Sequence, residues 1–126
     1  MDRDILIVDD DHDMSAAMAR ALRMAGYSSR VAENGALALE AVAARTPAVV
    51  LLDMLMPVMD GWQCARELRA RYGNTIPIIV VTAAEDARGR GEAIGADAVL
   101  GKPFELDELF RLIKRHSAGT ERDRTD

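Results

Sequence analysis

The sequence predicts one α/β domain built on a doubly wound, five-stranded parallel sheet with helices on both faces. Short apolar runs alternate along the chain with longer segments in which apolar residues recur at helical spacing. The apolar runs are nearly continuous, which is typical of strands that are buried on both faces. The chain has 126 residues, a length that favours a single domain.

Five short segments are predicted to be strands. They cover residues 5–8, 27–32, 49–53, 76–81 and 98–100. Turn and helix signals bound them. Gly26 is expected to end the first helix, and Pro47 breaks the chain before the third strand. Strands that alternate with helices in this way favour a parallel sheet.

The helices begin and end at recognisable residues. Asn34 is the expected N-cap of the second helix. The third helix is expected to begin near Asp60. Residues 83–95 predict a weaker helix, because each of its two inner glycines costs about 1 kcal/mol relative to alanine. The closing helix has an acidic first turn and a basic last turn, which suits the helix dipole.

The end of the chain is polar from Ser117 onward. A segment with so few apolar residues cannot bury enough surface to offset the entropy of ordering. We therefore expect the domain to occupy residues 1–116, with residues 117–126 as a disordered tail or the start of a linker.

Composition excludes several classes of protein. The net charge is −5 and no basic block occurs, so direct nucleic-acid binding is not expected. No apolar run approaches the roughly 20 residues that cross a bilayer. The first residues are too acidic for a secretory signal. The single cysteine, Cys64, cannot form an internal disulfide, and we expect a cytoplasmic location.

Residues able to do chemistry follow the ends of the predicted strands. Asp9 and Asp10 follow the first strand, Asp53 ends the third, Thr82 follows the fourth and Lys102 follows the fifth. In such folds ligands bind beyond the carboxyl ends of the strands, so these side chains are expected to converge. Carboxylate oxygens suit Mg²⁺, and a carboxylate can attack phosphorus. The hydroxyl and the ammonium could help to position a phosphoryl group and to neutralise the charge on its oxygens.

In combination these motifs resemble the receiver domain of two-component response regulators, over about residues 4–116. The matching segments are ILIVDD (residues 5–10), LLDMLMP (51–57) with the DG pair at 60–61, VVTA (80–83), and GAD (95–97) leading to KPF (102–104). The resemblance implies a flavodoxin-like (βα)5 fold with strand order 2-1-3-4-5.

The resemblance also implies a magnesium site. Asp9, Asp10 and Asp53 would hold the ion, together with the backbone carbonyl of Leu55. Asp10 would bind more directly than Asp9, which would act through water.

A role in phosphoryl transfer is implied for four residues. Asp53 would be the phosphoacceptor, and Thr82 and Lys102 would contact the phosphoryl group. Ala83 is small and would leave room for the donor. The bond between Lys102 and Pro103 would be cis.

The resemblance implies partners and a signalling role. The donor would be a phosphohistidine of a sensor histidine kinase or a histidine phosphotransfer protein. The recipient of the signal would be a protein target or an output domain, and the domain would be a monomer or a phosphorylation-dependent homodimer. It would not be an enzyme, beyond catalysing its own phosphorylation and slow dephosphorylation.

Three positions depart from the family pattern. Val99 stands where the family usually has an aromatic residue, so the familiar inward swing of a ring cannot operate. The hypothesis is that the predicted helix at residues 83–95 carries more of the switch. Leu55 and Ala84 are apolar and cannot orient a hydrolytic water, which predicts a long-lived aspartyl phosphate.

Other interpretations of the same residues stay open. The chain could be an interaction module that no longer accepts phosphate. It could also be a small phosphatase of the haloacid dehalogenase type, since Asp9 and Asp11 offer a DxD motif, although Asp13 is not the Thr or Val which that motif needs.

Asp11 and Asp13 are otherwise first-turn acids that favour the helix start. His12 is expected to be exposed and not a metal ligand, because Mg²⁺ prefers oxygen.

Overall fold

Five parallel strands form one sheet in the order β2-β1-β3-β4-β5, which confirms the predicted topology. The computed structural model describes residues 4–53, 61–83, 96–102 and 104–125, and for residues 83 and 118–125 the backbone alone. The strands are β1 (Asp4–Val8), β2 (Ser28–Ala32), β3 (Val49–Asp53), β4 (Ile78–Ala83) and β5 (Ala98–Lys102).

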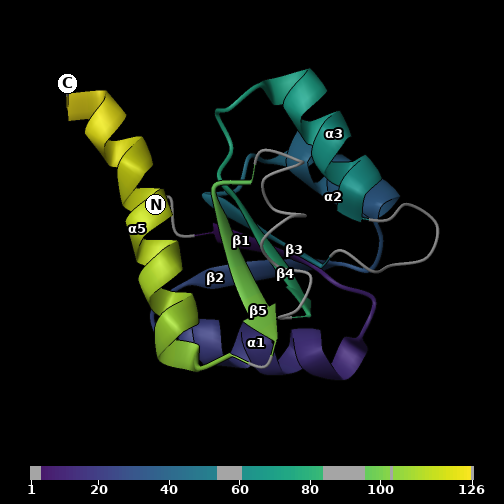
Figure 1. Ribbon diagram of the computed structural model, residues 1–126, viewed down its shortest axis with the longest axis vertical. Coiled ribbons are helices and arrows are strands. Elements are labelled where there is room, and N and C mark those ends of the chain that lie inside the picture. Colours follow the sequence, from purple (N-terminus) through teal and green to yellow (C-terminus); the bar gives the residue numbers. More distant parts are fainter. Residues whose placement is uncertain (1–3, 54–60, 84–95, 103, 126) are drawn as a thin grey trace.

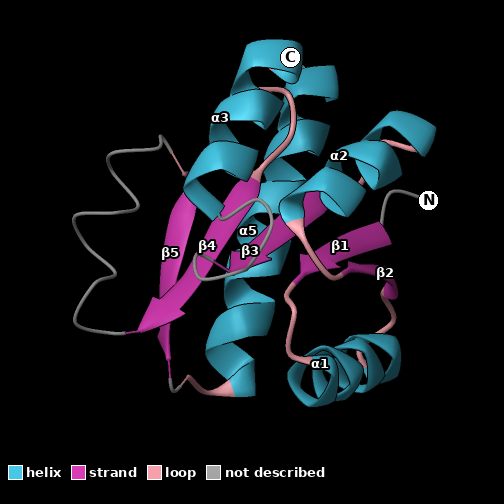
Figure 2. Cartoon of the chain, turned by 90° about the vertical axis from the view of Figure 1, so that its right-hand side faces the viewer, coloured by secondary structure: helices cyan, strands magenta, loops and turns pink. Residues whose placement is uncertain are grey.

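Helices cover both faces of the sheet (Figures 1 and 2). One face carries α1 (His12–Met24) and α5 (Leu106–Thr125), and the other carries α2 (Gly35–Ala44) and α3 (Gly61–Tyr72). No helix in the described part of the chain is long and apolar enough to span a bilayer.

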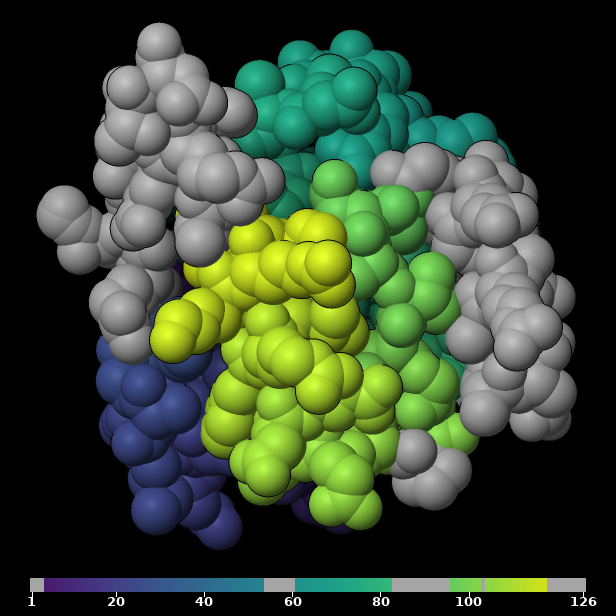
Figure 3. All heavy atoms as spheres, turned by 60° about the vertical axis from the view of Figure 1, so that its left-hand side comes forward, coloured from purple at the N-terminus to yellow at the C-terminus, as the bar shows by residue number. Residues whose placement is uncertain are grey.

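The core consists of two apolar clusters, one on each face of the sheet. Successive strand residues point to opposite faces, so each strand contributes to both clusters. Seen from the α5 side, the described side chains of α5 lie in front, and β5 is visible beside them (Figure 3). The strand residues beneath α2 and α3 are Leu6, Val8, Ala32, Val50, Leu52, Ile78 and Val80. Those beneath α1 and α5 are Ile5, Ile7, Val49, Leu51, Ile79, Val81 and Leu100.

Helix ends follow the expected chemistry. The carboxylate of Asp11 accepts hydrogen bonds from the backbone N–H groups of Asp13 and Met14, both at 3.1 Å, and so caps α1. Asn34 caps α2 by accepting from the backbone of Leu37 at 2.9 Å, as predicted. Gly26 follows α1 with a φ of 95°, a left-handed conformation that glycine adopts without a steric cost.

At the amino ends of β1 and β2, buried charge is neutralised. Asp4 is 8% exposed, and its carboxylate accepts from the Arg30 guanidinium, with Nε at 2.9 Å and Nη2 at 2.8 Å. Arg30 also donates to the carbonyls of Ala41 and Arg45, at 2.8 and 2.7 Å. One guanidinium therefore joins the two strands to the last turn of α2.

A second such connection lies at the amino ends of β4 and β5. Asp97 accepts from the backbone N–H of Ile78 at 2.8 Å and from Nη2 of Arg69 at 3.0 Å. Arg69, on α3, also donates to the carbonyls of Gly73 and Ile76, at 3.2 and 3.0 Å. These bonds fix the end of α3 against the start of the two strands.

Predictions about strand ends were wrong at β4 and β5. The fourth strand was expected at residues 76–81 and the fifth at 98–100, so Thr82 and Lys102 were expected to follow their strands. Both residues lie within strands, because pairing between β4 and β5 continues to Ala83 and Lys102. Ala83 was assigned to the start of a helix, but it is the last residue of β4 and pairs with Lys102. The remaining residues of that helix, 84–95, lie outside the described residues. The helix α5 extends in the described backbone to Thr125. The assignment of residues 117–126 to a tail or the start of a linker stays a prediction.

Replacing Arg30 with alanine is expected to lower the free energy of unfolding by about 2–3 kcal/mol, because a mostly buried carboxylate and two carbonyls lose their donor. Urea denaturation measures the change. Arg23→Ala is the control, since Arg23 is exposed on α1, and it should change stability by less than about 0.5 kcal/mol. Equal effects of the two substitutions would contradict a structural role for Arg30.

The thiol of Cys64 is expected to be unreactive in the folded protein. Burial raises its pKa from 9.0 to about 12, and a thiolate is the reactive form. In native protein at pH 8, Ellman's reagent should therefore react with Cys64 only as fast as the protein unfolds. In denaturant it should react at once with one thiol per chain. Above pH 9 the thiol ionises in the unfolded chain but stays neutral in the folded protein. The free energy of unfolding therefore falls as the pH rises from 9 toward 12. Rapid labelling of native protein would contradict the burial.

Candidate functional site

The ends of four strands bring the predicted residues to one edge of the sheet. Asp9 directly follows β1, Asp53 ends β3, Thr82 lies in β4 and Lys102 ends β5. The strands are parallel and in register. Asp53 pairs with Val81, and the residues of β4 that follow Val81 pair with Gly101 and Lys102.

Three carboxylates lie together at this edge. Asp9, Asp10 and Asp53 each offer an oxygen, and these oxygens lie within 4.8 Å of one another. Asp9 is 4% exposed and Asp53 8%, whereas Asp10 is exposed. At an effective dielectric constant of 20, two unit charges about 4 Å apart repel by about 4 kcal/mol. A set of oxygen donors this close fits Mg²⁺, which a few carboxylates hold while the ion keeps several waters.

The backbone fixes Asp9 on both sides. Its N–H donates to the carbonyl of Ala32 at 3.0 Å, which extends the pairing of β1 with β2 by one residue. Its Oδ1 accepts from the N–H of Asp11 at 2.9 Å. Since Asp11 also caps α1, the turn that carries Asp10 is held between the end of a strand and the start of a helix.

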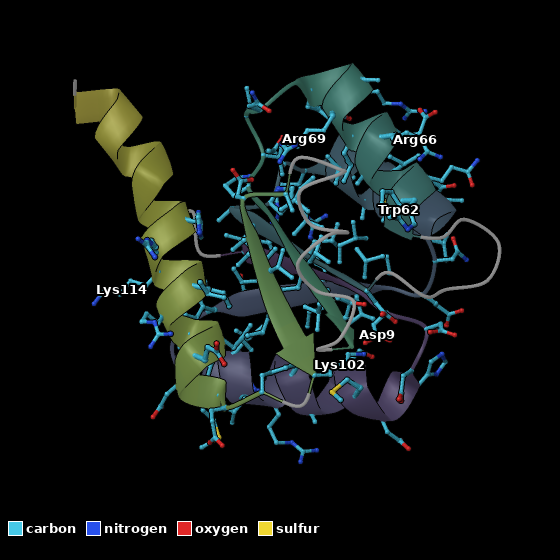
Figure 4. The ribbon with its side chains drawn as sticks, viewed as in Figure 1. Asp9, Trp62, Arg66, Arg69, Lys102 and Lys114 are labelled. Atoms are coloured by element: carbon cyan, nitrogen blue, oxygen red, sulfur yellow. The ribbon has the colours of Figure 1, made fainter. Side chains whose placement is uncertain are left out.

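Lys102 supplies a positive charge at the same edge. Its Nζ lies 3.8 Å from Oδ1 of Asp53, a distance of an ion pair and not of a direct hydrogen bond. The Lys102 side chain is 32% exposed, against 11% for that of Asp53. In Figure 4, Lys102 and Asp9 lie together at the strand ends, while Lys114, on α5, points away from them.

Strand alternation explains which residues share a face. Asp9, Asp53 and Lys102 continue the series of residues that face α1 and α5. Thr82 continues the opposite series, with Val80, and is buried at 3% exposure. Val99 packs against the cluster on that same opposite face and is partly buried.

A small pocket adjoins the carboxylates on the α1 and α5 side. Its volume is about 10 Å³, enough for about one water. The apolar side chains that line this side of the site were not predicted to belong to it. For Met14 and Met18 the sequence held an indication, because they recur at helical spacing directly after the acids. The pocket is lined by Ile7, Val8, Asp9, Met14, Met18, Leu51, Asp53, Val81, Lys102 and Phe104.

Some predicted features lie outside the described residues. They include the carbonyl of Leu55, the Lys102–Pro103 bond, and the segment assigned to the conformational switch. Of Ala83 the structure gives the backbone position, at the end of β4. The roles assigned to these residues stay predictions.

Comparison with known proteins agrees with this geometry. Residues 5–114 match the family described as response regulator receiver domain. Two relatives called response regulator MprA, from Mycobacterium sp. (strain KMS) and Mycobacterium leprae (strain TN), are each 42% identical over 112 residues. The matched region is 87% of this chain, but 48% and 49% of those proteins, so the chain spans about half the length of these relatives.

Solved structures of similar fold include a putative response regulator from Chloroflexus aurantiacus J-10-fl, with a TM-score of 0.88 and 34% identity. That match covers 94% of this chain and 99% of the other. The receiver domain of the sensor histidine kinase PA1611 from Pseudomonas aeruginosa PAO1 has a TM-score of 0.84 and 30% identity, over 94% of this chain and 99% of that one. The latter is described with a magnesium ion coordinated in its active-site cleft.

The family match covers most of the chain, and the fold and the strand-end acids agree with it. Such domains receive signals in two-component systems. The chain belongs to the response regulator receiver domain family.

Proposed function

We propose that Asp53 accepts a phosphoryl group from a phosphohistidine, in a reaction that depends on Mg²⁺. One observation carries the proposal: three carboxylate oxygens lie within 4.8 Å of one another, and an ammonium group lies 3.8 Å from one of these carboxylates. Two buried acids and one exposed acid with an ammonium beside them suit both a divalent metal and a phosphoryl group.

The metal is proposed to bind to Asp9, Asp10 and Asp53, with the carbonyl of Leu55 as a further ligand. When bound, Mg²⁺ neutralises charge on phosphoryl oxygens. The proposal is supported by the oxygen-only donor set and by the magnesium ion described in the similar receiver domain from Pseudomonas aeruginosa.

Asp53 acts as the nucleophile. One of its oxygens forms a bond to phosphorus while the bond from phosphorus to the donor nitrogen breaks, and the electron pair of that bond stays on the nitrogen. The product is an acyl phosphate. Lys102 stays next to Asp53 and contributes positive charge to the transferred oxygens, and the Thr82 hydroxyl donates a hydrogen bond to them.

The proposed donor is a sensor histidine kinase or a histidine phosphotransfer protein, with Ala83 leaving room for its approach. The chain spans about half the length of the relatives it matches. We propose that the signal passes from this domain to an output domain or to a separate target protein. We place the reaction in the cytoplasm, where a sensor kinase would supply the phosphoryl group.

Incubation with acetyl phosphate and Mg²⁺ is expected to add one phosphoryl group to the wild-type protein, as measured by intact mass. Asp53→Asn should give no adduct, and chelation of the metal should abolish the adduct in the wild type. Asp107→Asn is the matched control, because it removes an exposed carboxylate in the first turn of α5 and should leave the adduct unchanged.

An adduct that persists in Asp53→Asn would contradict the assignment of the phosphoacceptor. If the wild type gives no adduct, beryllofluoride binding separates two cases. Binding that needs Asp53 and Mg²⁺ would keep the site and restrict the donor, whereas no binding would favour the interaction-module alternative.

Lys102→Ala is expected to slow phosphorylation by acetyl phosphate roughly 100-fold, because the transferred oxygens lose a preorganised positive charge. The chain has one other lysine, Lys114, which is exposed on α5 and provides the matched control. Rates come from the time course of the intact mass. Equal rates in Lys102→Ala and Lys114→Ala would show that Lys102 takes no part.

A further inference from the structure

Two loops beside the acidic cluster are joined by a pair of exposed side chains. Nε2 of His12 lies 3.1 Å from Oε2 of Glu33, and the two side chains are 74% and 56% exposed. His12 is the first residue of α1, and Glu33 lies between β2 and α2. The contact links the segment that follows β1 to the segment that follows β2.

The pair extends an existing connection between the same two segments. One residue before Glu33, the carbonyl of Ala32 accepts from the N–H of Asp9 at 3.0 Å. His12 follows Asp9 by three residues, so Asp10 lies on the short turn between the two connections. Within that turn, the N–H of Asp11 donates to the Asp9 carboxylate at 2.9 Å.

Asp10 needs such support more than its neighbours do. Asp9 and Asp53 are buried, so packing restricts their carboxylates, whereas Asp10 is exposed. Repulsion among the three carboxylates favours movement of the one that is free to move, which is Asp10. If the turn opens part of the time, a smaller fraction of molecules has the three carboxylates arranged for metal binding. The apparent dissociation constant for Mg²⁺ rises in proportion.

We propose that His12 and Glu33 form a positioning pair that holds the Asp10 turn closed and so raises the affinity of the site for Mg²⁺. The inference rests on the proposed function, because it concerns the metal that the carboxylates would hold. Neither residue contacts the metal in this proposal. Their contact holds whether Nε2–H donates from a neutral or a charged imidazole.

An explanation based only on charge predicts the opposite change in Mg²⁺ affinity when His12 is removed. The negative charge of Glu33 attracts a cation, so its removal weakens Mg²⁺ binding under either explanation. Removal of His12 separates the explanations. Without a positioning role, the loss of a basic group should leave Mg²⁺ affinity unchanged or raise it, but the positioning pair predicts that the affinity falls.

The experiment measures the Mg²⁺ dissociation constant from amide chemical shifts in the full chain, for His12→Ala, Glu33→Ala and the double variant. Each single variant is expected to bind roughly two- to five-fold more weakly, the range for exposed ion pairs, and the double variant no more weakly than Glu33→Ala. His12→Gln keeps a donor at a similar reach and should recover most of the affinity.

Glu40→Ala is the charge-matched control, because Glu40 is exposed on α2, and its dissociation constant should equal that of the wild type. Melting temperatures in the presence of a chelator should agree among all variants, which separates positioning from a general loss of stability.

Unchanged or tighter binding in His12→Ala, in a wild type that binds Mg²⁺, would overturn the positioning pair and leave the proposed function intact. Effects of the two single substitutions that add in the double variant would also overturn it. A wild type that binds no Mg²⁺ would overturn the metal site itself, and this proposal with it.

Discussion

Burial of the sheet on both faces is the constraint on which the rest of this structure depends. Each central strand contributes alternate side chains to two separate apolar clusters, so a shift of one residue would move every side chain to the wrong face. The register is therefore fixed along β1, β3 and β4. Because the strands are parallel, fixing the register also fixes which residues meet at their carboxyl ends. The position of Asp53 beside Asp9 is a consequence of core packing and needs no separate interaction.

The acidic side chains at the two ends of the sheet have different partners. At the amino ends, Asp4 and Asp97 are each matched by guanidinium groups that also bind backbone carbonyls, so these acids stabilise the fold. At the carboxyl ends, the described residues include three carboxylates that lie close together, with the ammonium of Lys102 near one of them. Carboxylates this close repel one another, and a bound cation would relieve that repulsion. The proposed metal site and phosphoacceptor are therefore assigned to this end of the sheet.

Most of the fold followed from local patterns. Continuous apolar runs predicted the five parallel strands, and capping chemistry predicted the roles of Asn34 and Gly26. Strand ends were less certain, because hydrogen bonds to a neighbouring strand decide them. Ala83 shows this, since pairing with Lys102 keeps it in β4 although its sequence context suits a helix start.

By itself, the sequence determined the residue types at the site and the strand that each one follows. It also held the alternation that places Asp9, Asp53 and Lys102 on one face of the sheet and Thr82 on the other. Only the tertiary structure decided the distances, because these depend on how strands far apart in the chain align. It alone joined His12 to Glu33 and closed the inner side of the site with Met14 and Phe104. The physical reason is the same in each case, since contacts across different elements arise from packing that no local pattern encodes.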